Sequence, residues 1–265
     1  MRRTIVLLAA LVGLVASGCR DDHITITYRP HPGAVFSYAI HVSSSTTTAF
    51  ADRPVSHQPP TSADFTASHR VLDAQNGITR VEVRLAREGI GERTFVMRFD
   101  RAAQLTAVES VEGIPAEALG SLGLSELFPA AAGAPPDRPL RPGDRWTIDD
   151  HVQLAGMDAP SRLVGTGRLV ELGVVDGHDT ATVTSSTTLP LTSTTTTPQG
   201  VQTLTGTQTT TITVVYDLRD GSVRHSTATT MGRFDVVLGP PTGQPGTPIN
   251  GTLTVELTSE IRRTS

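Results

Sequence analysis

Cysteine is scarce in this sequence and lysine is missing from it. Cys19 is the single cysteine among 265 residues, so no disulfide can form within the chain and the fold must rely on apolar burial. Lysine is absent, so all 22 basic residues are arginine, and the formal net charge is −4. A mildly acidic chain has no basic patch of the kind that binds nucleic acid, and we expect no nucleic acid partner.

Long hydrophobic runs are also scarce, and the one present lies at the N-terminus. Arg2 and Arg3 precede residues 5–16, which are apolar but too few to cross a bilayer as a helix. A positive start followed by a short apolar run and small residues is typical of a secretion signal. Residues 16–18, Ala-Ser-Gly, then lead directly to Cys19.

This junction resembles the lipobox of bacterial lipoproteins, with Ala16 where leucine is commonest. The resemblance implies removal of residues 1–18 and attachment of a diacylglycerol thioether to Cys19, which becomes the mature N-terminus. It further implies that the protein is lipid-anchored to the outer side of the cytoplasmic membrane, or to an outer membrane where one exists. An ordinary cleaved signal peptide or an uncleaved anchor is the alternative interpretation.

Catalytic and metal-binding motifs are missing as well. The sequence contains no Gly-x-Ser-x-Gly motif, and none of its eight histidines has a partner at the i, i+4 spacing of a helical zinc site. Asp149 and His151 would share one face of a strand, but two ligands leave a metal mostly uncoordinated. Glu82, between Arg80 and Arg84, is best explained as a surface charge. We therefore expect a protein that is not an enzyme and uses no cofactor or metal.

Alternation of apolar and polar residues is what the sequence has in abundance. Such period-two patterns indicate strands with one buried face, which suit antiparallel sheets. Threonine, whose branched side chain favours extended backbone, is frequent. The fold expected is all-β, a strongly twisted antiparallel sheet or half-barrel of about ten strands. The clearest patterns are Phe36/Tyr38/Ile40/Val42, Val81/Val83/Leu85, Phe95/Met97/Phe99, Ile212/Val214/Tyr216 and Leu253/Val255/Leu257.

The chain divides into two β-rich halves around one segment of different character. After the signal we expect a tether and first strand (19–31), a first β-meander (32–113), a helical segment and linker (114–138) and a second β-meander (139–265). The helix is predicted over 115–128, where Pro115 suits a first turn and apolar residues fall on one side.

The two halves also resemble each other. Residues 32–37 and 142–147 share a Pro-Gly turn before an aromatic strand start. Residues 70–72 and 168–170 share an arginine followed by two apolar residues, and Phe99-Asp100 matches Tyr216-Asp217. Strand proteins rich in threonine and valine also produce such matches by chance, so duplication and coincidence both stay open.

Proline, glycine and tryptophan give further local expectations. Three prolines predict a long loop over 52–62. Gly165-Thr166-Gly167 interrupts a strand pattern, which indicates a bulge or bend in the sheet. Trp146, the only tryptophan, is expected to anchor the start of a strand in the core rather than to line a ligand cavity.

The Pro-Gly-Asp-x-Trp motif ending at Trp146, the later Tyr216-Asp217 with Asp220-Gly221, and the lipobox together resemble a broad class of uncharacterised bacterial lipoproteins built of repeated β-meanders. The plan is distantly similar to lipoprotein carriers and mycobacterial lipid-binding lipoproteins, in which a curved sheet folds over helices around an apolar cavity. This chain departs from those families in having one short helical stretch.

The resemblance implies a non-enzymatic binding module for an apolar or lipid ligand, with the membrane as partner through Cys19. No ligand-binding residue can be assigned, because those families recognise lipid by shape. A structural or protein-interaction domain with a packed core, facing an envelope protein, is the alternative. A cavity of about 300 Å³ or more would favour binding, and a filled interior the alternative.

Overall fold

The computed structural model describes residues 23–51, 54–89, 91–103, 105–112, 114–115, 135–152, 160–197, 200–241 and 244–265. Cys19 and the expected signal segment lie outside these residues. Within them the chain forms twelve strands and no helix, and hence none that could span a bilayer. The strands are β1 (Val35–Phe50), β2 (Ser56–Gln75), β3 (Ile78–Arg87), β4 (Gly91–Phe99), β5 (Leu105–Val111), β6 (Ile114–Pro115), β7 (Arg145–Val152), β8 (Ser161–Val175), β9 (His178–Thr197), β10 (Gly200–Asp217), β11 (Val223–Gly239) and β12 (Ile249–Arg263).

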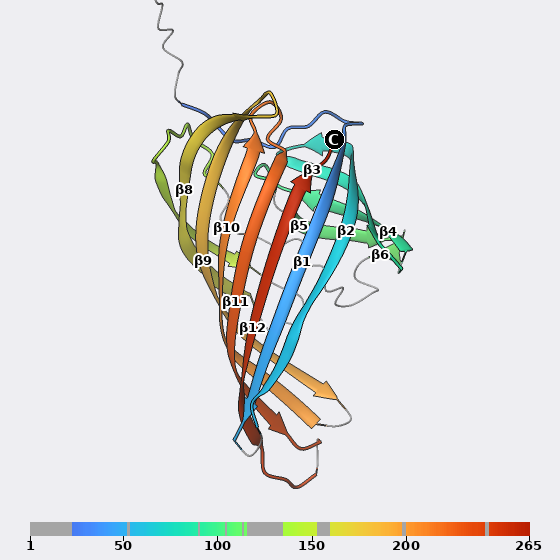
Figure 1. Cartoon of the computed structure of the whole chain (residues 1–265), viewed down its shortest axis with the longest axis vertical. Helices are drawn as coiled ribbons and strands as arrows, with labels where there is room; N and C mark the ends of the chain where they lie inside the picture. Colours follow the sequence, from blue (N-terminus) through green and yellow to red (C-terminus); the bar gives the residue numbers. More distant parts are fainter. Residues whose placement is uncertain are drawn as a thin grey trace, which may run out of the picture.

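All twelve strands belong to one twisted antiparallel sheet (Figure 1). Strands β1 to β6 follow one another from the middle of the sheet to one edge, and β7 to β12 run from the opposite edge back to the middle. The two series meet where β1 pairs with β12, from Tyr38 opposite Arg263 to Phe50 opposite Gly251. The all-β fold and the two meanders are confirmed, and the meanders are halves of a single sheet whose edges are β6 and β7.

Both halves begin with the same turn. Gly33 and Gly143 have φ values of +82° and +96°, a backbone region that favours glycine. The Gly33 N–H donates to the Val71 carbonyl at 2.9 Å, and the Gly143 N–H donates to the Leu169 carbonyl at 2.7 Å. Directly after Val71 and Leu169, the pairing with the next strand shifts register in each half.

The turns that follow later in the two halves also match, and they occur in the same order. The hairpins after β2 and β8 turn at Asn76-Gly77 and Asp176-Gly177, and all four of these residues have positive φ, as a type I′ turn requires. Asp100 and Asp217, each directly after an aromatic residue, accept a hydrogen bond from the backbone N–H two residues later, at 2.8 and 3.0 Å. These shared details, none of which depends on threonine or valine content, favour duplication over coincidence.

The core covers one face of the sheet, called here the inner face, which carries Phe36, Tyr38 and Ile40 on β1. Alternation along the strands sends most of the large apolar side chains to this face, as the sequence predicts, together with some small polar ones such as Thr210 and Ser226. The first half contributes one large cluster and the second half contributes another. Their central residues are Val81, Val83, Phe95, Met97 and Phe99 in the first, and Ile26, Leu140, Leu169, Ala181 and Tyr216 in the second.

Residues 23–31 cross the upper end of the sheet and connect its halves (Figure 1). The Tyr28 N–H donates to the carbonyl of Arg101, which follows β4 in the first half. The Arg29 N–H donates at 2.8 Å to the carbonyl of Asp220, in the turn between β10 and β11. The expected strand within 19–31 is wrong for the described part, because its only strand-like pairing is an isolated bridge between Ile24 and Leu140.

The described part of the expected helix is also a strand. Ile114 and Pro115 form β6 and pair with Val111 and Ser110 of β5. Pro115 is tolerated there because β6 is an edge strand, where a missing N–H breaks no inner ladder. The remainder of the predicted helix, from residue 116, lies outside the described residues.

The long loop expected over 52–62 is much shorter, because β2 begins at Ser56 and includes Pro59 and Pro60. The pairing of β1 with β2 shifts register at these prolines, since Ser44 lies opposite Thr61 and Thr46 opposite Gln58. On its other side, β2 pairs with β3 only from Phe65 onward. The bulge on the β1 side and the missing pairing on the β3 side mean that neither proline has to donate a backbone N–H to a neighbouring strand.

Candidate functional site

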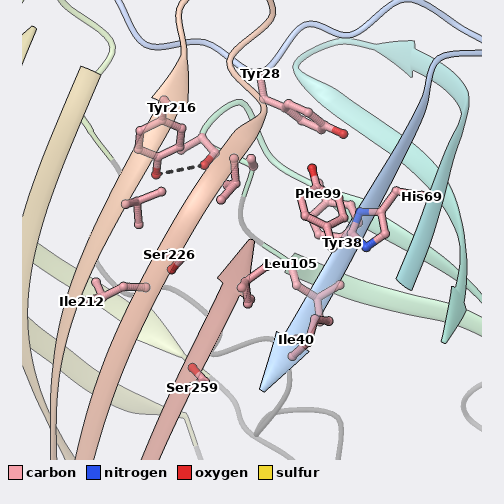
Figure 2. A pocket seen from close by; sticks show the side chains of 15 residues that line it. Tyr28, Tyr38, Ile40, His69, Phe99, Leu105, Ile212, Tyr216, Ser226 and Ser259 are labelled. Carbon is pink, nitrogen blue, oxygen red and sulfur yellow. Dashed lines mark hydrogen bonds between the residues drawn. The ribbon is translucent and has the colours of Figure 1, made fainter. Parts of the chain in front are cut away.

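A cavity of about 110 Å³ lies on the upper inner face, lined by residues from both halves of the sheet and by the N-terminal segment (Figure 2). The segment contributes Tyr28. The first half contributes Tyr38, Ile40, His69, Phe99 and Leu105, and the second half contributes Ile212, Val214, Tyr216, Ser226, Ser259 and Ile261, among others.

Small side chains in the middle of the sheet leave this space open. Ser226 and Ala228 on β11 and Ser259 on β12 occupy neighbouring inner-face positions, where Ala228 lies directly opposite Ser259. Larger side chains flank them, since Val214 on β10 pairs with Ser226 and Val42 on β1 pairs with Ser259. The cavity is therefore bounded by large side chains and has a floor of small ones.

All three tyrosines of the chain line this cavity. The Tyr216 hydroxyl donates a long hydrogen bond, 3.5 Å, to the Ala102 carbonyl. Tyr28 and Tyr38 are 8% and 6% exposed as whole residues. Their hydroxyls have no hydrogen bond to any described residue, and Figure 2 shows them directed to the same part of the cavity. Burial raises the pKa of all three phenols, so they are neutral hydrogen-bonding groups at physiological pH.

His69 supplies the only imidazole of the cavity lining. Its ring centroid lies 4.7 Å from that of Tyr38 and 5.9 Å from that of Phe99. Burial lowers the pKa of His69 to about 4, because the surrounding apolar side chains do not solvate a cation. The imidazole is consequently neutral near pH 7, like the phenols beside it.

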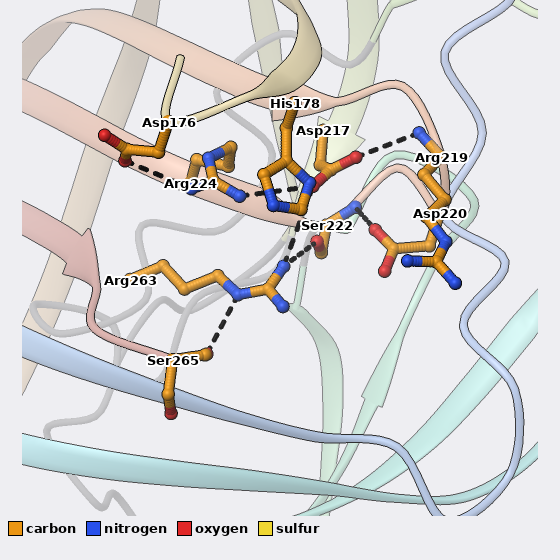
Figure 3. A network of polar contacts seen from close by, with 9 residues as sticks. All are labelled: Asp176, His178, Asp217, Arg219, Asp220, Ser222, Arg224, Arg263 and Ser265. Atoms are coloured by element: carbon orange, nitrogen blue, oxygen red, sulfur yellow. Dashed lines mark hydrogen bonds and ion pairs between the residues drawn. The ribbon is translucent and has the colours of Figure 1, made fainter.

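A polar network lies at the upper end of the second half, outside the cavity lining (Figure 3). Its centre is Asp217, whose side chain is only 3% exposed. The Asp217 carboxylate lies 3.0 Å from His178 Nδ1 and 3.3 Å from the Arg224 guanidinium. Arg263 approaches the same carboxylate at 3.9 Å and donates a 3.0 Å hydrogen bond to the Ser222 hydroxyl.

This network has a structural explanation. It joins the start of β9, the β10–β11 turn and the end of β12, which are far apart in the sequence. The Arg263 guanidinium also lies over the Phe36 ring, 4.6 Å from its centroid, and so connects the network to the first core cluster. Because each charge has an opposite charge or a hydrogen bond beside it, we assign the network to stability rather than to chemistry.

The residues that the sequence singled out as chemical candidates are engaged elsewhere. Both oxygens of Asp149 accept hydrogen bonds from Arg162, at 2.7 and 2.6 Å, and this guanidinium lowers the pKa of the carboxyl. Glu82 lies on the outer face and pairs with Arg70 at 2.9 Å and with Arg84 at 3.3 Å, as expected for a surface charge. Across the described residues, no three or more His, Cys, Asp or Glu side chains are placed to share a metal ion.

Trp146 anchors β7, as predicted, by packing against the second core cluster and a smaller one. The bulge expected at Gly165-Thr166-Gly167 is wrong, since β7 and β8 pair without a register shift there. Gly167 lies directly opposite Trp146 and leaves room for its ring, because a side chain at this position would overlap the indole. The glycine therefore permits close approach of an aromatic ring rather than a bend.

A wider hollow of about 790 Å³ lies near β1, β2 and β3, and it is open to solvent. Its rim is charged, with Asp64, Glu92 and Arg262 among the lining residues, and His41 pairs with Asp64 at 2.7 Å. No cluster of buried polar groups converges on it among the described residues. We therefore regard the cavity on the inner face, which has the more apolar lining, as the better candidate for a ligand site.

Sequence reasoning did not identify the cavity residues. Tyr38 and Tyr216 were predicted as members of strand patterns and Tyr216 also as part of a repeated motif, but neither as a ligand contact, and neither Tyr28 nor His69 was singled out. Their convergence depends on the β1–β12 pairing that joins the halves and on the path of residues 23–31. No motif or spacing in the sequence signals either arrangement.

No protein family and no curated protein matches the chain at a significant level.

Proposed function

We propose that this protein is a lipid-anchored, extracytoplasmic binding module whose cavity holds an apolar part of a ligand, with no catalytic step. The observation that carries the proposal is the partly open cavity on the inner face, walled by Phe99, Leu105, Val214 and Ile261. Well-packed interiors rarely leave room of this size, so a cavity with side chains from three separate parts of the chain needs an explanation.

The size of the cavity limits what it holds. Its 110 Å³ is well below the roughly 300 Å³ of a usual ligand pocket. It is closer to the engineered apolar cavity of about 150 Å³ that binds benzene. An aromatic ring or a short alkyl segment fits, and each buried methylene contributes about 0.8 kcal/mol. The cavity is therefore proposed to hold one end of a longer ligand.

The inner face offers further apolar surface below the cavity. Leu253, Val255 and Leu257 occupy successive inner-face positions on β12, and Phe234 lies opposite Leu253 on β11. All four side chains are half-buried rather than exposed. The remainder of an apolar ligand would follow this row along the long strands.

The expected anchor would place the cavity close to the membrane. Only three residues separate Cys19 from His23, the first described residue of the segment that carries Tyr28. Even a fully extended link of this length reaches only about 14 Å. A lipid on Cys19 would therefore hold the upper end of the sheet near the bilayer, from which an apolar ligand comes.

Filling the cavity tests the proposal. Ser259→Phe places a ring in the space, whereas Thr258→Phe, one position earlier on the opposite face of β12, is the matched control. We expect 1-hexanol to bind the unsubstituted protein and the control with a Kd on the order of 1 mM in isothermal titration calorimetry. Ser259→Phe should abolish the signal. Equal binding to all three proteins, or to none, would instead favour the packed structural or protein-interaction domain.

A further inference from the structure

We propose that the cavity selects an uncharged group capable of hydrogen bonding, such as a hydroxyl or an ester carbonyl, at the end of an apolar ligand. This inference rests on the proposed binding function and specifies its ligand class. It assigns the recognition to Tyr28 and Tyr38, and it predicts rejection of carboxylate and phosphate groups.

The two phenols have hydrogen-bonding capacity that the described residues do not use. Tyr28 and Tyr38 are more than nine-tenths buried, yet neither hydroxyl bonds to a described residue. A phenol hydroxyl can donate one hydrogen bond and accept others, so both groups keep hydrogen-bonding capacity that a molecule in the cavity can use. Since both hydroxyls are directed to one part of the cavity, a single ligand group there would satisfy both (Figure 2).

The described lining of the cavity also carries no charged side chain at pH 7. None of the described residues that line the cavity is Asp, Glu or Arg. The one titratable base, His69, stays neutral near pH 7, because burial lowers its pKa to about 4. A carboxylate entering this site would lose its hydration and gain no opposite charge, which is strongly unfavourable.

Two charged residues near the tyrosines do not make the cavity favourable for an anion. Arg263 and Asp220 both act on Tyr28 and Tyr38 from outside the lining, and their effects on the phenol pKa values oppose each other. The Arg263 guanidinium is already engaged with the Ser222 hydroxyl at 3.0 Å and with the Ser265 carbonyl at 2.9 Å. It lies outside the cavity lining and is held there by these bonds and by its contact with the Phe36 ring.

The test compares 1-hexanol, hexanoate and toluene by isothermal titration calorimetry at pH 7, using the unsubstituted protein and a Tyr28→Phe, Tyr38→Phe double variant. These substitutions remove two hydroxyls and keep both rings. We expect hexanol to bind the unsubstituted protein at least tenfold more tightly than hexanoate. In the double variant, hexanol affinity should fall about tenfold, while toluene affinity should stay within twofold.

The outcomes separate this inference from the proposed function. Hexanoate binding as tightly as hexanol, or an unchanged hexanol affinity in the double variant, would overturn the inference and leave the apolar site intact. Failure of toluene and hexanol alike to bind the unsubstituted protein would overturn both. Retained toluene binding shows that the double variant is folded.

Discussion

At the scale of single residues, the most unusual position is His69. This half-buried histidine lies among apolar side chains, and the loss of hydration there lowers the pKa of its imidazole to about 4. The inner face instead provides aromatic neighbours, Tyr38 and Phe99, which contact the neutral ring. The same environment that keeps His69 neutral makes the cavity unsuitable for an anion.

This environment gives a pH dependence of stability with a defined sign. In the unfolded chain His69 protonates near pH 6.5, but in the folded protein only near pH 4. The free energy of unfolding is therefore unaffected by His69 above pH 6.5. Below that pH, protonation of His69 in the unfolded chain lowers the free energy of unfolding, by roughly 3 kcal/mol at most once the pH reaches 4. In His69→Phe this contribution is absent. Urea unfolding measures this effect. Between pH 7 and pH 4.5 the free energy of unfolding should decrease less in the variant than in the unsubstituted protein, and equal decreases would contradict the assigned role of His69.

At the scale of strands, glycines opposite aromatic residues are a recurring device. Gly167 lies opposite Trp146, Gly206 opposite Phe234, and Gly251 opposite Phe50. In each pair a Cβ on the glycine would overlap the partner's ring. The aromatic ring covers the glycine backbone of the neighbouring strand, which compensates for the missing side chain.

Substitutions on β8 test this pairing. Gly167→Ala forces the Trp146 ring to move and should lower the free energy of unfolding by about 1–3 kcal/mol. Gly173→Ala is the control on the same strand, because its added methyl group meets only the Thr180 hydroxyl at an ordinary 3.7 Å. It should change stability by less than about 0.5 kcal/mol. Chemical denaturation measures both, and similar losses for the two variants would contradict the role of Gly167.

The alternation of residues within a segment predicted most of the strands. It failed where the structure of a segment depends on which other strand lies beside it. Alternation identified the inner-face residues of β1, β3, β4 and β10 because period two is a property of one strand alone. Pro59 and Pro60 were assigned to a loop because a sequence does not show which strand edges lack partners. Gly167 was interpreted as a bulge because its explanation, Trp146, lies on a different strand.

At the scale of the whole molecule, two similar meanders form one sheet through the β1–β12 pairing. This arrangement brings inner-face residues of both halves together, and residues 23–31 close the upper end over them. The sequence indicated the two halves but not whether they share one sheet, because nothing local encodes the pairing of strands so far apart. The cavity residues could not be foreseen for the same reason.

The most direct test of the account is native mass spectrometry of the protein produced without residues 1–19 in a bacterial host. We expect an added non-covalent mass that is released on gentle activation and identifies an uncharged amphiphile. Ser259→Phe should lose this mass, and Thr258→Phe should keep it. A protein that carries no added mass and binds neither 1-hexanol nor toluene would contradict the claim that the inner face holds an apolar ligand.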